Sequence, residues 1–93
     1  MDPTIQINKR VSVAVLFRDK GEPPELCMPA KMSYQGREIV FSELGMRHPT
    51  SAGKRMLHIF DMSDGLNDYR LQFDAESLTW ILISQIEGVH EPT

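Results

Sequence analysis

The 93-residue sequence has a single cysteine, Cys27, and no run of apolar residues longer than five. One cysteine excludes an intramolecular disulfide framework. A membrane-spanning helix needs about 20 consecutive apolar residues, so the sequence predicts no membrane segment. The first residues, Met1-Asp-Pro-Thr-Ile5, are polar and show no signal peptide. Together these absences predict a cytoplasmic protein.

Basic residues are nearly absent from the second part of the chain. Residues 56–93 contain one, Arg70, against seven acidic residues, for a net charge of −6. Residues 1–55 contain nine basic and six acidic residues, for a net charge of +3. Such a bipolar chain can pair with a copy of itself or attract a charged partner. If the two parts interleave in a barrel, however, the asymmetry is blurred in space.

The sequence also lacks the motifs that metal sites and catalytic sites need. Zinc ligands converge at about 2.0–2.3 Å and usually come from short-spaced pairs such as Cys-x-x-Cys or His-x-His, which do not occur. No serine lies in a glycine-flanked nucleophile elbow, and Cys27 beside Met28 is typical of an inert, small apolar side chain. His58, between Met56 and Phe60, is expected to be half-buried. We therefore expect no metal, no small-molecule cofactor and no enzymatic activity.

The most informative stretch runs from Tyr69 to Ile83. Tyr69, Leu71 and Phe73 alternate with polar residues, which places successive side chains on opposite faces of an extended strand. A polar turn follows at residues 74–77, and then comes a second run of β-branched and aromatic residues. Two such runs joined by a short turn predict a β-hairpin.

Period-two patterns elsewhere predict four more strands, at residues 5–18, 26–34, 37–44 and 54–62. The sequence therefore predicts one all-β domain over residues 1–93, with about six antiparallel strands in a small barrel or rolled sheet. Residues 45–53 contain Pro49 and two glycines and are expected to form the longest irregular loop. Pro29 predicts that its strand lies at an edge or carries a bulge. The tail from about residue 87 to 93 is expected to be frayed.

These patterns favour a non-enzymatic binding module that binds a protein or self-associates. Ile81 and Ile83 suit the core, which leaves Trp80 and Leu82 on the other face, where either a partner chain or the N-terminal segment would cover them. An exposed edge strand offers a second route to a dimer. The six methionines either fill gaps in a small core or form an adaptable binding surface.

Binding of single-stranded nucleic acid is the alternative, since small barrels bind single strands with a basic groove and exposed aromatic side chains. Tyr34, Phe41 and Trp80 are the aromatic residues that would stack on bases, although the chain is acidic overall. For either role, the candidate binding residues lie near strand ends and in the 45–55 region, and they are Lys9, Arg10, Arg47, His48, Lys54, Arg55 and Trp80.

Two segments resemble known proteins. They are Met32-Ser-Tyr-Gln-Gly-Arg-Glu-Ile-Val40, and His58-Ile-Phe60 followed by Tyr69-Arg-Leu-Gln-Phe-Asp74 and Trp80-Ile-Leu82. This combination resembles small single-domain prokaryotic β-barrel proteins of unassigned function, and the resemblance spans roughly residues 11–86. It implies a barrel-like fold and assigns no functional residue to this chain.

Overall fold

The computed structural model describes residues 4–20, 27–52 and 55–88, with only the backbone described for residues 46–52 and 55. The all-β class is confirmed. The segment expected as one strand over residues 37–44 is divided at Phe41 and Ser42, which adds a strand to the expected set. The described strands are β1 (Thr4–Phe17), β2 (Cys27–Tyr34), β3 (Arg37–Val40), β4 (Glu43–Ala52), β5 (Arg55–Ser63), β6 (Asp68–Asp74) and β7 (Thr79–Ile86).

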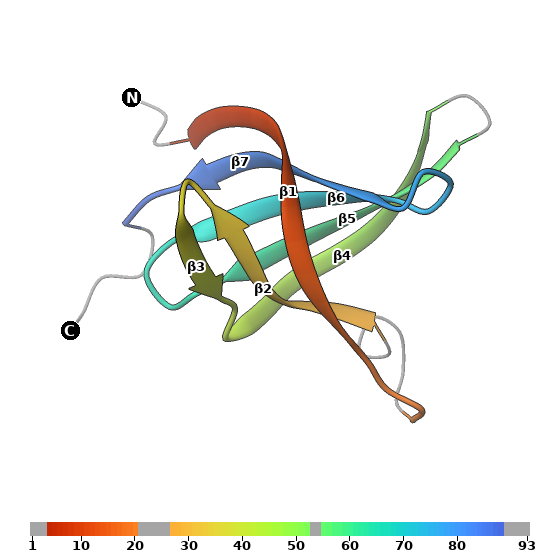
Figure 1. Cartoon of the computed structure of the whole chain (residues 1–93), viewed down its shortest axis with the longest axis horizontal. Coiled ribbons are helices and arrows are strands. Elements are labelled where there is room, and N and C mark those ends of the chain that lie inside the picture. Colours follow the sequence, from red (N-terminus) through yellow and green to blue (C-terminus); the bar gives the residue numbers. More distant parts are fainter. Residues whose placement is uncertain (1–3, 21–26, 53–54, 89–93) are drawn as a thin grey trace.

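The strands form one antiparallel sheet in the order β3-β2-β1-β7-β6-β5-β4. Strands that follow one another in the chain are neighbours in the sheet, except β3 and β4, which are its two edges. The long strand β1 pairs with β7 through its first part and with β2 through its second part. The sheet consequently curls into a half-barrel that remains open between β3 and β4 (Figure 1). The expected rolled sheet is confirmed.

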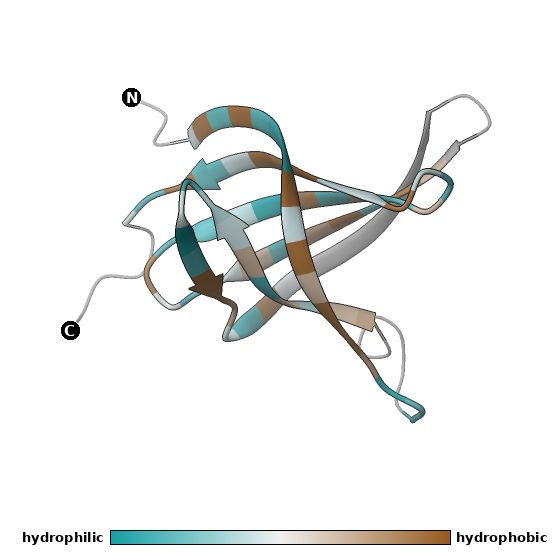
Figure 2. Ribbon diagram, in the orientation of Figure 1, coloured by the Kyte–Doolittle hydropathy of each residue, from teal (hydrophilic) through white to brown (hydrophobic). Residues whose placement is uncertain are grey.

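The core lies inside the curl, where β2 and β3 pack over β5, β6 and β7. Hydrophobic and hydrophilic residues alternate along β1 in Figure 2, as period two requires when only one face of a strand is covered. We call the face that carries the core the inner face and the opposite one the outer face. The buried core residues are Met32, Ile39, Phe60, Met62, Tyr69, Leu71, Trp80 and Leu82.

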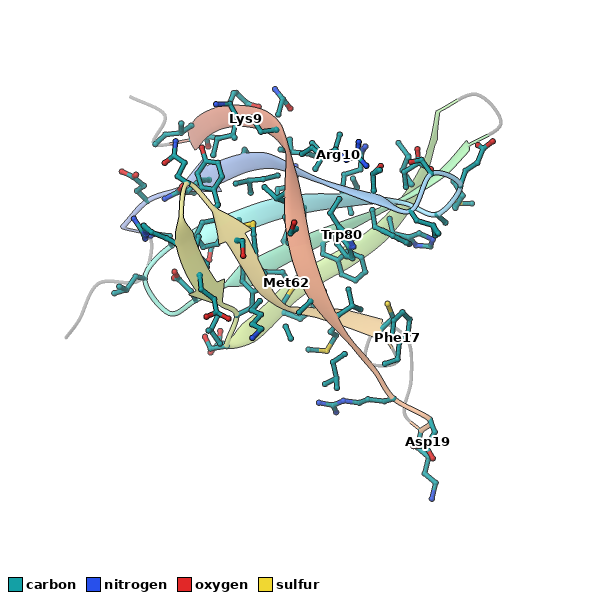
Figure 3. The ribbon with its side chains drawn as sticks, in the orientation of Figure 1. Lys9, Arg10, Phe17, Asp19, Met62 and Trp80 are labelled. Carbon is teal, nitrogen blue, oxygen red and sulfur yellow. The ribbon has the colours of Figure 1, made fainter. Side chains whose placement is uncertain are left out.

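Trp80 belongs to this core, so the expectation that Trp80 and Leu82 face away from it is wrong. Trp80 is 8% exposed, and its ring centroid lies 4.9 Å from that of Phe73 and 5.5 Å from that of Phe60. Figure 3 shows Trp80 inside the curl, behind β1. Strand β7 is apolar on both faces, so alternation alone does not determine its inner face. The pairing of β7 with β6 determines it, because Trp80 lies opposite Phe73 and Leu82 lies opposite Leu71.

Strand β2 carries the bulge that its proline predicted. Val15 pairs with Pro29 and Ala14 with Lys31, which leaves Ala30 as an extra residue in β2. A bulge removes one regular pairing position and so accommodates a residue that has no N–H. Pro29 is fully buried. The bulge alternative is therefore confirmed. The edge alternative is not, because β2 lies between β1 and β3.

The expected irregular loop over residues 45–53 is wrong, because residues 43–52 form β4 and pair with β5 along their length. Leu44 pairs with Met62 and Met46 with Asp61, which makes Gly45 a bulge rather than a strand end. A Cβ at Gly45 would lie 3.3 Å from the carbonyl oxygen of Asp61, so the glycine permits this close approach. The backbone pairing with β5 therefore overrides the weak strand propensity of the segment.

The chain leaves β7 through a turn at Glu87 and Gly88. The Gly88 N–H donates a 3.0 Å hydrogen bond to Asn67 Oδ1. The rest of the expected tail, 89–93, lies outside the described residues. No helix in the described ranges has the length and hydrophobicity that crossing a membrane requires.

Candidate functional site

The structure places Lys9 and Arg10 on β1, far from the basic residues of β4. Both are exposed (Figure 3). Lys9 and Arg47 lie at the two ends of one row of paired residues that crosses five strands. The residues between them in this row are Leu82, Leu71 and Phe60. Neighbouring strands are about 4.8 Å apart, so the two ends of this row are about 19 Å apart along the sheet. Lys9 and Arg10 therefore do not form one compact patch with the β4 residues.

The remaining basic candidates gather on the β4–β5 hairpin. Arg47 and His48 lie within β4, and Arg55 is the first residue of β5. The structure describes the backbone of these three residues, and Lys54 lies outside the described residues. A basic surface on this hairpin therefore stays a prediction.

The aromatic residues expected to stack on bases lie in or against the core. Trp80 is buried, and Tyr34 and Phe41 are half-buried and pack against the core cluster. The ring of Phe41 contacts that of Tyr69 at a centroid distance of 5.8 Å and an angle of 61°, an edge-to-face contact. None of the three forms an open stacking platform.

Strand β4 is the longer edge of the sheet. It spans ten residues and pairs with β5 on one side, while the order of the described strands ends there. The other edge, β3, has only four residues. Backbone groups along an unpaired edge can pair with another extended chain. The β4 edge is therefore a candidate site for strand addition.

Exposed apolar side chains occur on two hairpins that diverge from the body of the half-barrel (Figure 1). Phe17 is 74% exposed and Leu16 43% exposed at the end of β1, and Met56 is 51% exposed at the start of β5. Phe17 and Asp19 project along the β1–β2 arm in Figure 3. These side chains add apolar surface beside the open part of the sheet.

The outer face carries a hollow of about 470 Å³. A smaller hollow of about 140 Å³ adjoins it and shares two of its carboxylates, Asp61 and Asp68. Residues of β1, β5, β6 and β7 line the larger hollow, and they are Thr4, Gln6, Asp61, Asp68, Tyr69, Arg70, Ile83, Ser84 and Ile86. We call this site the outer hollow.

An ion pair forms one wall of the outer hollow. Arg70 Nε donates to Asp61 Oδ1 at 2.8 Å, and Arg70 Nη2 donates to Asp61 Oδ2 at 3.1 Å. Bidentate pairing of this kind fixes the guanidinium plane as well as its charge. The hydrogen bonds that Arg70 donates to Asp61 raise the pKa of Arg70 above its ordinary value, because they stabilise the charged form.

Three bulges surround the outer hollow. Ile83 has no partner in β6, because Arg70 pairs with Ser84 and Leu71 with Leu82. On β1, two residues lie opposite Ile83, and one of them, Asn8, has a positive φ of 53°. Gly45 is the third bulge. Bulges bend strands and redirect side chains, which accounts for a hollow on the outer side of a curled sheet.

The candidate site holds charged and hydrogen-bonding groups. Among the described residues, no three histidine, cysteine, aspartate or glutamate side chains lie close enough together to bind one metal ion. His58 is half-buried, with its ring 6.3 Å from that of Phe73, and Cys27 is half-buried.

No protein-family model, curated protein or solved structure matches the chain. The evidence for each candidate site is therefore its geometry.

The sequence prediction missed the outer hollow, and one signal pointed to it. Arg70 is the single basic residue among residues 56–93, and it alternates with the core residues Tyr69 and Leu71. Its contact with Asp61 could be anticipated, because the two residues lie on strands that follow one another in the chain and pair as a hairpin. Ser84 could not, because its even spacing from Leu82 predicts the inner face until the Ile83 bulge is known.

Proposed function

We propose that the protein is a non-enzymatic interaction module that self-associates, with β4 pairing against β4 of a second copy. The observation that carries the proposal is the ten-residue edge that β4 leaves at one end of the sheet. Unpaired N–H and C=O groups at a sheet edge are a ready template for another strand. Strand addition gains affinity from main-chain hydrogen bonds, so it needs no catalytic group or cofactor.

A second copy is the occupant proposed for this edge. Two identical edges can pair antiparallel about a two-fold axis, so that each contact occurs twice. Such a pairing extends the sheet from one copy into the next through main-chain hydrogen bonds.

Pro49 limits the pairing to the first part of β4. A proline has no N–H to donate, and natural sheets use proline, charge and shortness to protect edges. The other edge, β3, is protected by its four-residue length and by Arg37 and Glu38. The segment from Glu43 to His48 lacks a proline, so it is the part of either edge best able to pair.

The cytoplasmic location and the likeness to prokaryotic β-barrel proteins remain part of this proposal. Nucleic-acid binding receives less support, because Trp80 is buried and Lys9 and Arg10 are separated from β4 by three strands. The same experiment that tests self-association also detects bound nucleic acid.

The test is light scattering after size exclusion, over a range of protein concentrations and at low and high salt. A dimer has a mass of about twice 10.6 kDa. Met46→Lys places the same charge on the pairing segment of both copies and should weaken the dimer, because charged side chains protect natural sheet edges. Lys9→Glu is a charge-changing control on β1 and should leave the mass unchanged.

Two results would overturn the proposal. A monomer at every concentration would exclude self-association. A complex that co-purifies with material absorbing at 260 nm and releases it in salt would favour nucleic-acid binding instead, because phosphate contacts weaken steeply as salt is added.

A further inference from the structure

The end of β1 carries an aromatic side chain that its own chain leaves uncovered. Val13 and Val15 pack against the core from β1. Phe17 follows them on the same face, because side chains two positions apart in a strand point the same way. Phe17 is nevertheless 74% exposed, the highest value among the large hydrophobic side chains of the described residues. The inner face of β1 therefore continues past the part of the sheet that covers it.

The β1–β2 arm, where Leu16 pairs with Met28 and Phe17 with Cys27, extends past the β4 edge. In Figure 1, the end of β1 crosses β4 and continues beyond it, on the side where β4 has no neighbour among the described strands. Figure 3 shows Phe17 on this projecting part. The face that carries Phe17 therefore overhangs the edge at which we propose self-association.

Antiparallel pairing at β4 places a second copy beneath this overhang. Directly opposite residues of two antiparallel strands have their side chains on the same face of the sheet. The inner faces of two paired copies therefore lie on the same side of the joined sheet. Each β1–β2 arm lies on that side and extends past its own β4 toward the other copy. The surface that the arm then meets is the inner face of the second copy's β4–β5 pair.

That inner face offers apolar surface. Met56, His58 and Phe60 alternate along β5 and share the face that carries the core, to which Phe60 belongs. Met56 is 51% exposed and His58 is half-buried, so this part of β5 is incompletely covered within its own copy. A methionine thioether packs favourably against an aromatic ring. Met56 is therefore a suitable contact for Phe17 of a second copy.

The area that a stable dimer needs also favours this contact. A stable interface buries about 800 Å² on each partner. The pairing segment from Glu43 to His48 spans only about 20 Å along one strand, so it offers a narrow strip of surface. A buried aromatic side chain contributes about 150–250 Å². Two arms, each with Phe17 buried, supply part of the area that the edge alone lacks.

We propose that the β1–β2 arm clasps the second copy, with Phe17 packed on the inner face of that copy's β4–β5 pair. This inference rests on the self-association proposed above and adds the side-chain contact that stabilises it. Because the dimer is symmetric, the contact occurs twice. The paired edges contribute main-chain hydrogen bonds, and the two arms contribute burial of apolar surface.

The first test measures the dissociation constant of the dimer by light scattering over a range of concentrations. Phe17→Thr removes the ring and keeps a residue that suits a strand. It should raise the dissociation constant about 10- to 100-fold, because two apolar contacts are lost in each dimer. Leu78→Asn is the matched control, since Leu78 is 73% exposed and asparagine tolerates its positive φ. This control should leave the dissociation constant unchanged.

The second test is an isotope-filtered NOE measurement on dimers that contain one labelled and one unlabelled copy. We expect intermolecular NOEs between the ring of Phe17 and the side chain of Met56 or His58 in the other copy. Their absence from an intact dimer overturns the arm contact. The amide spectrum of each variant is compared with that of the wild type first, so that unfolding is recognised.

The outcomes separate this inference from the proposed function. A dimer that Met46→Lys weakens and Phe17→Thr does not weaken keeps the β4 pairing and overturns the arm contact alone. A monomer at every concentration overturns both. Binding to phosphatidylcholine vesicles that depends on Phe17, in place of a dimer that depends on it, assigns the arm to a lipid surface and overturns this inference.

Discussion

The hydroxyl of Tyr69 donates a 3.0 Å hydrogen bond to Oδ2 of Asp64. Tyr69 is 2% exposed, and its ring belongs to the core. Asp64 begins the loop between β5 and β6, and its Oδ1 accepts the N–H groups of Leu66 at 2.9 Å and Asn67 at 2.8 Å. The contact therefore connects the core directly to a loop that the aspartate itself organises.

Tyr69→Phe removes this hydroxyl and keeps the ring. We expect a loss of about 1–2 kcal/mol in the free energy of unfolding, because a hydrogen bond to a carboxylate is lost. The measurement is denaturant unfolding at neutral pH. Tyr34→Phe is the matched control, since the Tyr34 hydroxyl has no partner in the residues that the structure describes. Equal losses in the two variants would contradict the importance of the Asp64 contact.

Because the Asp64 carboxylate accepts several hydrogen bonds, we expect the protein to lose stability in acid. Burial by itself raises the pKa of Asp64, but the N–H groups of Asn67 and Leu66 and the Tyr69 hydroxyl outweigh it and hold this pKa below its ordinary value of 3.8. Its stabilising effect is complete above the unfolded-state pKa and is lost as pH falls through the lower folded-state value. Asp64→Asn should therefore flatten the pH dependence of unfolding below about pH 4.

That measurement is a series of unfolding curves from neutral pH down to strong acid. The asparagine keeps an oxygen that accepts the loop N–H groups, so the loop geometry has a substitute while the charge is removed. An unchanged acid slope in Asp64→Asn would show that other carboxylates cause the acid sensitivity.

Leu78 has a positive φ of 59°, in the turn between β6 and β7, and is 73% exposed. Its N–H donates a 2.7 Å hydrogen bond to the Asp74 carbonyl oxygen, which holds this backbone conformation. Glycine adopts positive φ without the Cβ penalty, so Leu78→Gly should stabilise the protein by up to about 1 kcal/mol. Leu78→Ala keeps a Cβ and should give no such gain in thermal unfolding. A gain of the same size in both variants would point to removal of the apolar side chain.

Trp80 is the single tryptophan of the chain, so its fluorescence reports the core directly. Because it is buried between Phe60 and Phe73, we expect blue-shifted emission, weak quenching by iodide and a red shift on unfolding. Trp80→Ala should cost about 3–5 kcal/mol through the cavity it leaves. Red-shifted, readily quenched emission from the folded protein would contradict the buried position.

The accuracy of the sequence prediction followed the distribution of apolar residues. On β6, Tyr69 and Leu71 alternate with Arg70 and Gln72, and one face is clearly the inner one, so the strand was predicted correctly. On β7, both faces are apolar, and the choice of the Trp80 face depends on its pairing with Phe73, which a single strand does not encode.

Strand β4 and the outer hollow were missed for different physical reasons. Gly45 and Pro49 lower the strand propensity of β4, which forms because β5 provides a complete hydrogen-bonding partner. The hollow depends on the bulge at Ile83, which turns Ser84 from the inner to the outer face. A single inserted residue reverses the alternation, and nothing in the neighbouring residues predicts where the insertion falls.

The pairing of β1 with β7 has a consequence for how the protein folds. Of the six strand pairings, five join consecutive strands, while β1–β7 joins Thr4 to Ile86 across almost the whole chain. Local hairpins close quickly, whereas a contact between distant residues must first overcome a large loss of chain entropy. We therefore expect two units, β1–β3 and β4–β7, to form before β1 docks on β7, and we expect that docking step to limit the folding rate.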